Sequence, residues 1–330
     1  MDFSRITVVS QGPITPLTKA SLKSVRKYLP ESHIILSTWE GSDIEGLEFD
    51  EIVYSKDPYS NDRYYPSNLN RMLLSTLNGL KRVRSEFTLK MRTDFCLTGT
   101  NFINLFQLKL PEPKEYKVFK NRIVAYVWKS KPGRLFNIGD FHFFGYTSDI
   151  ISLFDIPPMA DSDFFWLKVN PPTNRFFLRR NTNRFHPEQY IWISFLRKNN
   201  IDVKLADYTD YTFEKKVMSE KIFVNNVIFA SFYEFSIITW KANLLSFNLP
   251  VLQRGYDFDD WISLCKKYIK SDYEHINPIR HIKLYKSIIL CSFLLFGKFL
   301  SCLLPQRKSR QKVRNYFEKI SLNFLLNGKL

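Results

Sequence analysis

Short apolar runs followed by amphipathic segments recur through the N-terminal third of this chain, and this alternation limits the folds it can adopt. The apolar runs predict strands at residues 6–9, 33–36, 51–54 and 87–90. Apolar residues spaced three and four apart predict helices at residues 17–28 and 69–83, the second with Asn68 at its N-cap. Such strand–helix units build a mostly parallel sheet with helices on both faces, a Rossmann-type α/β fold.

The middle of the chain continues this pattern less regularly. Residues 122–128 and 142–145 are typical of strands, and residues 147–154 and 187–198 are typical of helices, the second with proline in its first turn. Residues 200–255 contain short apolar runs that fit no period. Because 45% of the residues are hydrophobic, the chain can fill a large core, and we predict one α/β domain over residues 1–255.

The C-terminal region, residues 256–330, has a different composition. Residues 265–330 contain 14 Lys and Arg but only three Asp and Glu, so most of the net charge of +16 falls there. The apolar run 288–304 contains Lys298, and its 17 residues are marginal for crossing a hydrocarbon core about 30 Å thick. The basic residues that flank it are Lys283, Lys286, Arg307, Lys308, Arg310, Lys312 and Arg314.

This composition predicts a helical tail that lies in the plane of an anionic membrane surface, with its cations on the headgroups. The alternative is a buried core helix with solvated charges at its ends. A nucleic-acid partner is not expected, because the basic residues flank an apolar run instead of alternating with aromatic residues that could stack on bases.

The cysteines and the N-terminus indicate a cytoplasmic protein. The four cysteines form no CxxC pair, which argues against a zinc site and against a disulfide framework. The first predicted strand begins at Ile6, and no basic and apolar signal peptide precedes it. Together with the tail, this predicts a peripheral protein at the cytoplasmic face of the inner membrane.

Polar residues follow the predicted strands, where ligands bind in parallel sheets. These residues are Gln11, Gly12, Thr38, Trp39, Arg92 and Asp94. The Asp94 carboxylate could bind Mg²⁺ or Mn²⁺, which would neutralise a diphosphate, and Arg92 could bind a phosphate directly. The alternative for Asp94 is a residue that caps the next turn. Asp161 and Asp163 form a literal Asp-x-Asp, but they follow prolines and are more typical of a turn.

Two further segments carry candidate chemistry. Asp140 and His142 flank a short aromatic strand, where a carboxylate could bind sugar hydroxyls; a capping Asp on an ordinary edge strand is the alternative. Glu188 follows His186 in the first turn of a predicted helix, where the helix dipole favours an ionised carboxylate. Such a carboxylate could deprotonate an acceptor hydroxyl, although acidic residues are common at this position for their effect on the dipole alone.

Several of these segments, taken in order over residues 5–200, resemble the WavE lipopolysaccharide-synthesis family. The resembling segments are residues 8–13, 25–30, 35–41, 70–71, 75–80, 90–95 and 187–190. The resemblance implies a GT-A-type glycosyltransferase fold and a role in lipopolysaccharide core, O-antigen or capsule assembly. Asn70 and Arg71, which lie in these segments, join the candidate donor site, and His142 and His186 form the candidate acceptor site.

GT-A enzymes usually have an Asp-x-Asp after the strand that ends the nucleotide-binding half. Here that position reads Arg92-Thr93-Asp94, so only the last carboxylate matches. Glu188 matches the usual placement of an acidic base, and Asp140 is its rival. We therefore expect an enzyme that moves a sugar from a nucleotide-sugar donor onto a lipid-linked saccharide. A non-catalytic saccharide-binding or assembly protein on the same fold is the alternative.

Overall fold

The computed structural model describes residues 1–59, 65–111, 113, 115–127, 130, 133–170, 182–239 and 256–270, with short stretches between residues 292 and 320. The chain forms two compact units. The first contains Met1–Ile237 and Tyr256–Tyr273, and the second contains Ile238–Gly255 and Glu274–Leu330. The expected boundary at residue 255 therefore differs from this division, because residues 256–273 belong with the α/β unit.

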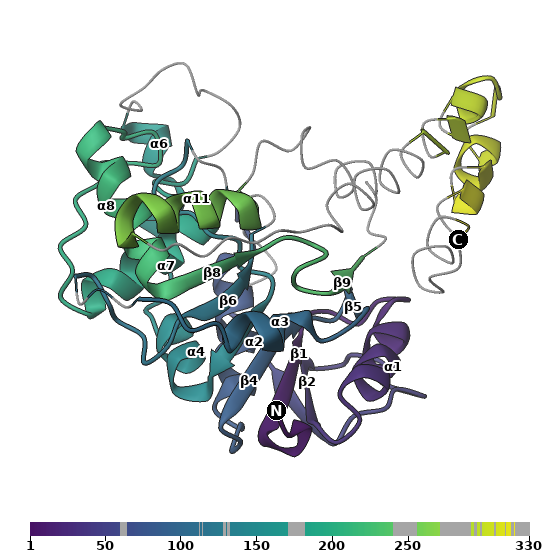
Figure 1. Cartoon of the computed structure of the whole chain (residues 1–330). Helices are drawn as coiled ribbons and strands as arrows, with labels where there is room; N and C mark the ends of the chain where they lie inside the picture. Colours follow the sequence, from purple (N-terminus) through teal and green to yellow (C-terminus); the bar gives the residue numbers. More distant parts are fainter. Residues whose placement is uncertain are drawn as a thin grey trace. The chain divides into compact units, whose positions relative to one another are not determined.

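A sheet of seven strands forms the centre of the first unit, among the residues described (Figure 1). The strands are β1 (Ile6–Gln11), β2 (His33–Trp39), β3 (Glu51–Ser55), β4 (Phe87–Arg92), β6 (Ile123–Tyr126), β7 (Phe143–Tyr146) and β8 (Val227–Ala230). Their order is β3-β2-β1-β4-β7-β6-β8. Strand β7 runs antiparallel to both β4 and β6, and the other neighbouring pairs that the structure records are parallel. A separate pair joins β5 (Cys96–Leu97) to β9 (Ile237–Ile238).

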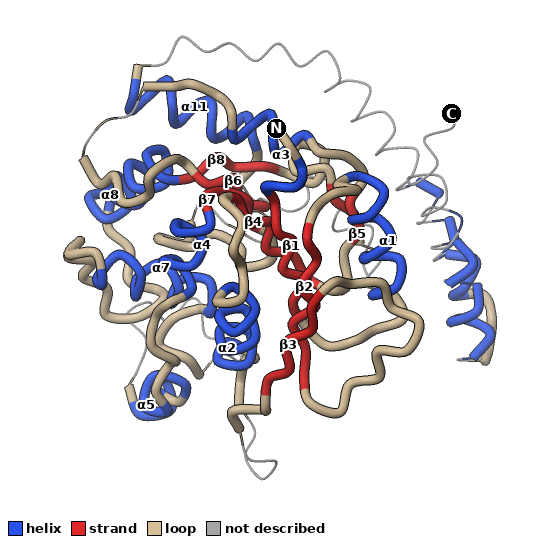
Figure 2. The backbone as a smooth tube through the Cα atoms, turned by 90° about the horizontal axis from the view of Figure 1, so that it is seen from below, coloured by secondary structure: helices blue, strands red, loops and turns tan. Residues whose placement is uncertain are grey.

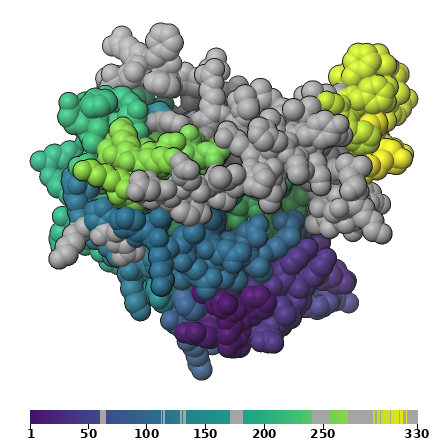
Figure 3. Space-filling model, viewed as in Figure 1, coloured from purple at the N-terminus to yellow at the C-terminus, as the bar shows by residue number. Residues whose placement is uncertain are grey.

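Helices cover both faces of the sheet (Figure 2). On one face, α2 (Leu69–Leu80) packs on β1, β2 and β3, and α4 (Thr147–Phe154) packs on β7, with α7 (Pro187–Lys198) against α4. The opposite face carries α3 (Asn101–Phe106), and α1 (Thr18–Tyr28) packs against β5. At one end of the sheet, α8 (Phe213–Asn226) and α11 (Phe258–Ile269) pack on each other and on β8, and α11 forms part of the surface in Figure 3. The expected α/β fold is confirmed.

The helix α2 approaches the sheet closely because a glycine faces it. A Cβ at Gly79 would lie 2.7 Å from Val9 Cγ1 and 2.9 Å from Ser37 Cβ. The helix runs antiparallel to the strands: Arg71 near its start pairs with Asp57 beyond the end of β3, and Arg82 beyond its end pairs with Glu51 at the start of β3. The N-terminus of α2 therefore lies at the edge where the parallel strands end.

One sequence-based assignment changes in the structure, and one region left unassigned contains regular elements. The sequence predicted a loop turn at Asp161 and Asp163. In the structure, both residues lie at the start of a short helix, α5 (Asp161–Phe164). A helix N-terminus favours negative charge, so the two carboxylates suit this position without a metal. The region that fitted no period contains α8 and β8, followed by β9.

The second unit contains most of the apolar and basic tail. Part of the run 288–304, including Lys298, and the flanking residues Lys283, Lys286, Arg307 and Arg314 lie outside the described residues. Within the part that is described, no helix is long and apolar enough to span a membrane. Three large apolar side chains of the run are exposed: Phe296, Phe299 and Leu303.

Candidate active site

The ends of three neighbouring parallel strands bring residues from distant segments together. Gln11 at the end of β1 is in register with Ser37 of β2 on one side and with Arg92 of β4 on the other. Because the strands are parallel, the residues that follow them share one edge of the sheet. This edge therefore gathers Gly12, Thr38, Trp39 and Asp94, as the sequence predicted.

A tight turn after β1 fits against the turn after β4. The Gly12 N–H donates to the Ser37 carbonyl over 3.0 Å, and its φ of 136° is a conformation that favours glycine. A Cβ at Gly12 would lie 2.9 Å from Thr93 Oγ1. The Thr93 hydroxyl donates to the Pro13 carbonyl over 2.8 Å. These contacts fix the backbone of both turns at the edge of the sheet.

Some candidate donor residues have structural partners. Gln11 is buried, and its Nε2 donates to Ser75 Oγ of α2 over 2.8 Å. Both ends of the Asn70 amide bond the backbone of Met159, at 2.8 and 3.0 Å. Thr38 is buried, with its hydroxyl 3.2 Å from Ser42 Oγ. The side chains of Gln11, Asn70 and Thr38 therefore help to hold the edge of the sheet in its conformation. That these side chains contact a donor stays a prediction.

Two other donor candidates are more accessible. Trp39 is half-buried at the end of β2. The Arg71 guanidinium forms an ion pair with Asp57 at 2.9 Å and lies 4.8 Å from the ring centroid of Tyr59. Tyr59 in turn stacks on Tyr65, with 3.8 Å between the ring centroids. An aromatic and cationic cluster therefore stands beside the N-terminus of α2.

The most distinctive feature of the edge is a two-point ion pair between Arg92 and Asp94. Arg92 Nε donates to Asp94 Oδ1 over 2.8 Å, and Nη2 donates to Oδ2 over 2.7 Å. The Arg92 side chain is 27% exposed and that of Asp94 only 3%. Burial lowers the pKa of Arg92, but the hydrogen bond and charge of Asp94 outweigh it and raise this pKa above its usual value. The pair therefore presents a positive group to solvent.

A buried lysine that the sequence analysis missed lies next to this pair. Lys90 of β4 has no exposed surface, and its Nζ donates to the carbonyls of Asp140 and Phe141. Burial lowers the pKa of Lys90 to about 7. The sequence did contain a signal for this buried lysine, because Lys90 lies inside a predicted strand. A charge in that position requires partners from elsewhere in the fold.

The segment that contains Asp140 and His142 lies beside Arg92. The Phe141 ring centroid is 4.9 Å from the Arg92 guanidinium carbon, and Asp140 is half-buried. His142 is fully buried, with its ring centroid 4.3 Å from that of Phe95 and 5.5 Å from that of Tyr126. Burial, with the nearby charges of Lys90 and Arg92, holds the pKa of His142 well below its usual value. A ring with no exposed surface cannot contact an acceptor in this conformation, which corrects the expected role of His142.

His186 and Glu188 lie at the N-terminus of α7. His186 is the N-cap residue, with its ring centroid 4.5 Å from that of Tyr208, and Glu188 is half-buried in the first turn. One turn further, the Tyr190 hydroxyl is 3.1 Å from the carbonyls of residues 157 and 158. The next residue, Met159, bonds Asn70. The segment 157–159 therefore connects the N-terminus of α7 to that of α2, at the edge where the strands end.

The described residues do not fit the expected Mg²⁺ or Mn²⁺. Both carboxylate oxygens of Asp94 accept hydrogen bonds from Arg92, and the carboxylate is almost without solvent contact. Across the described part of the chain, no three His, Cys, Asp or Glu side chains are grouped so that they could hold a metal ion. Asp140 contributes one further carboxylate near the pair.

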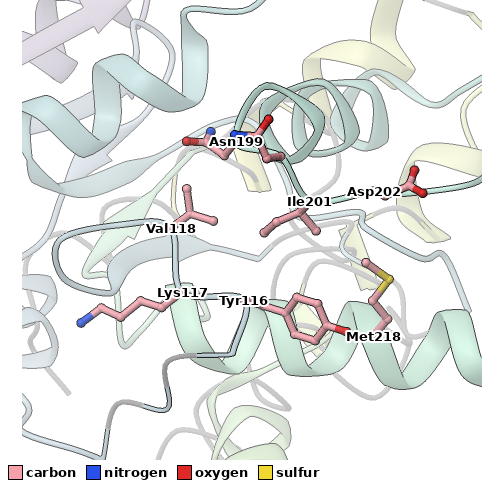
Figure 4. Close-up of a pocket in the computed structure, with 8 residues that line it drawn as sticks. Tyr116, Lys117, Val118, Asn199, Ile201, Asp202 and Met218 are labelled. Carbon is pink, nitrogen blue, oxygen red and sulfur yellow. The ribbon is translucent and has the colours of Figure 1, made fainter.

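Two pockets of about 600 Å³ each lie in the described part of the chain, away from these residues. One lies between the loop before β6 and the C-terminal end of α7 and is lined by Tyr116, Val118, Ile201 and Met218, among others (Figure 4). The other is lined by Phe87 and Tyr146, at the opposite end of β4. Neither pocket contains a residue that the sequence predicted for the site.

The mostly parallel sheet, with its polar edge formed by β1, β2 and β4, defines an α/β protein of the type that binds ligands beyond the carboxyl ends of its strands. The chain belongs to the WavE lipopolysaccharide synthesis family, whose sequence model matches residues 6–294. This match confirms the resemblance found in the sequence.

Other comparisons are less informative. No curated protein matches the chain. Among solved structures, the chain is similar to the apo-form glycosyltransferase GlyE of Streptococcus pneumoniae TIGR4, with 12% sequence identity and a TM-score of 0.33. The similarity covers 79% of this chain and 59% of the GlyE chain. A TM-score this low supports no conclusion about activity or substrate.

Proposed function

We propose that the protein is a glycosyltransferase that moves a sugar from a nucleotide-sugar donor onto a saccharide intermediate of lipopolysaccharide core, O-antigen or capsule. The observation that carries this proposal is the Arg92–Asp94 pair at the end of β4, beside the tight turn at Gly12. A solvent-facing guanidinium held by a buried carboxylate suits the diphosphate of such a donor. Membership of a lipopolysaccharide synthesis family supports a saccharide acceptor.

Each candidate residue has a separate role in the proposed reaction. Arg92 binds the diphosphate, and Trp39 and Arg71 contact the rest of the donor. The bond between the anomeric carbon and the diphosphate oxygen breaks, the acceptor oxygen forms a bond with this carbon, and Glu188 takes the acceptor proton. Asp140 is the rival base because it lies in the cluster around Arg92.

A binding screen tests the proposal. We expect sugars linked to one of UDP, GDP, CDP or dTDP to raise the melting temperature of the protein, with and without Mn²⁺. A ligand at a hundred times its dissociation constant should stabilise the fold by about 2.7 kcal/mol. Free sugars serve as the control. If no nucleotide-linked sugar raises the melting temperature, the proposed donor site is wrong.

The competing function is non-catalytic binding or assembly of saccharides on the same fold. The absence of a second aspartate at Arg92 favours it, because the usual Asp-x-Asp is incomplete. Donor turnover without acceptor separates the two functions. A transferase releases nucleoside diphosphate slowly by hydrolysis, whereas a binding protein releases none.

We further propose that the enzyme works on a lipid-linked acceptor at the anionic cytoplasmic surface of the inner membrane. The exposed side chains of Phe296, Phe299 and Leu303 support this, since a buried core helix would cover them. Lys308, Arg310 and Lys312 follow the run and are exposed. Each basic residue near an anionic surface contributes about 1 kcal/mol.

Flotation with anionic liposomes measures this attachment. We expect the full-length protein to float at low salt, to float less at high salt, and to lose most binding when Phe296, Phe299 and Leu303 are replaced by serine. Phe213→Ser is the matched control, because Phe213 is an aromatic residue of α8 that is 67% exposed. Removal of residues 281–330 should also abolish flotation yet preserve donor binding. Full-length protein that stays at the bottom of a low-salt gradient would contradict the membrane proposal.

A further inference from the structure

We infer that Arg92, and not a divalent cation, neutralises the donor diphosphate, and that Asp94, Phe141 and Lys90 hold its guanidinium in position. This inference rests on the proposed function, because it assigns how the same site binds the leaving group. It changes the role expected from the sequence for Asp94, which held a metal, and keeps the one expected for Arg92, which bound a phosphate. Asp94 is then a positioning residue, and Arg92 is the residue that contacts the ligand.

The two partners of the Arg92–Asp94 ion pair differ in their exposure to solvent. The Asp94 side chain is 3% exposed and that of Arg92 is 27% exposed, so a ligand at this edge meets the guanidinium and not the carboxylate. The two hydrogen bonds to Asp94 engage Nε and Nη2. A guanidinium has five N–H groups, and the others can donate to phosphate oxygens. Because Asp94 fixes the plane of the guanidinium, little side-chain freedom is lost when the phosphate binds.

Phe141 and Lys90 also help to hold the Arg92 guanidinium in position. The Phe141 ring lies 4.9 Å from the guanidinium carbon, which restricts the arginine on a second side. Lys90 Nζ donates to the carbonyl of Phe141 over 3.1 Å and also to that of Asp140. These bonds tie the segment of Asp140 and Phe141 to β4, the strand that ends in Arg92. Lys90 therefore acts on the site through Phe141, without contact to the ligand.

The Asp94 carboxylate is poorly suited to bind a divalent cation. A divalent cation at Asp94 would have to share a nearly buried carboxylate with a guanidinium that already bonds both of its oxygens. The two positive groups would repel each other at short distance in a region of low polarity. No other group of ligating side chains stands in the described part of the chain to offset this cost. Arg92 already supplies positive charge at this position.

Calorimetric titration of the full-length protein with UDP, GDP, CDP and dTDP tests the inference. One titration series contains EDTA and the other contains Mn²⁺. We expect the preferred nucleoside diphosphate to bind with a dissociation constant that is the same in both buffers, within about threefold, because a metal-independent site gains little from the ion. Arg92→Gln should weaken binding by at least about tenfold in EDTA, the loss expected for a hydrogen bond to a charged group.

The matched control is Arg82→Gln. Arg82 also pairs with a carboxylate, Glu51, but at the opposite edge of the sheet. This variant should bind the nucleoside diphosphate as the unchanged protein does. Binding that requires Mn²⁺ would overturn the inference and leave the proposed donor site intact. If no nucleoside diphosphate binds in either buffer, both the inference and the proposed function fail.

The positioning residues need a separate measurement. Phe141→Leu should weaken binding of the nucleoside diphosphate several-fold while the melting temperature and the hydrolysis rate at saturating donor stay near those of the unchanged protein. Lys90→Met should do the same, and Phe141→Leu decides the matter if the Lys90 variant does not fold. Unchanged affinity in Phe141→Leu would show that neither residue positions Arg92.

Discussion

Replacement of Glu188 by glutamine is expected to lower the turnover of sugar transfer by about 10²–10⁴-fold while the affinity for the donor changes little. A general base acts on the acceptor hydroxyl in the transition state, so its loss should appear in kcat and not in donor binding. Glutamine keeps the size of the side chain but cannot accept the proton. Steady-state kinetics with a varied donor and a saturating acceptor measure both effects.

Glu214→Gln is the matched control for this prediction. Glu214 also lies in the first turn of a helix, α8, where the dipole of that helix acts on it as the dipole of α7 acts on Glu188. A similar loss of turnover in this variant would show that the effect arises from helix stability. Normal turnover in Glu188→Gln, together with an inactive Asp140→Asn variant, would transfer the role of the base to Asp140.

Replacement of Asp94 by asparagine should reduce transfer more than about tenfold, which corresponds to ~1.4 kcal/mol of transition-state stabilisation. Asparagine fills the same space but carries no charge, so the guanidinium of Arg92 loses the ion pair that fixes its orientation. The protein should still fold, because Arg92 retains partial contact with solvent. Transfer assays of the purified variant, with its circular dichroism spectrum, check both parts of the prediction.

Asp50→Asn is the corresponding control. Asp50 pairs with Arg26 and accepts a hydrogen bond from the Ile34 N–H at the opposite edge of the sheet, so its loss should affect stability and not activity. If Asp94→Asn retained more than about a tenth of the wild-type activity, Asp94 would have no essential part in transfer. A variant that loses activity only because it unfolds would be recognised from its spectrum.

Local patterns in the sequence were sufficient for much of the fold. Short apolar runs in the strands and a period of 3.6 in the helices predicted the parallel units of β1, β2 and β4, and the bounds of α4 and α7 agree with the predicted ranges. Patterns also placed Gly12, Thr38 and Asp94 at strand ends. Residues 213–230 escaped prediction because α8 is buried on several sides near its end, so its apolar residues show little helical period.

The partners of the polar residues depended on tertiary structure. Asn70 bonds Met159, 89 residues away, and Lys90 bonds carbonyls 50 and 51 residues away. Such pairs form where packing brings strands and loops together, and no local period records them. The sequence made His142 a candidate acceptor residue beside a short strand, but the rings of Phe95, Tyr126 and Phe235 pack around it.

The sequence by itself determined that this chain forms a mostly parallel α/β sheet and that Arg92 and Asp94 stand at the end of one strand, because the predicted strand at residues 87–90 ends directly before them. Only the tertiary structure decided which of the two meets solvent. The segment of Asp140 and Phe141 packs beside β4 and restricts the arginine, while the carboxylate lies almost fully buried beneath it. Exposure depends on everything that packs around a side chain, and this is why the choice between an acidic metal site and a basic phosphate site could not be read from residues 92 to 94 alone.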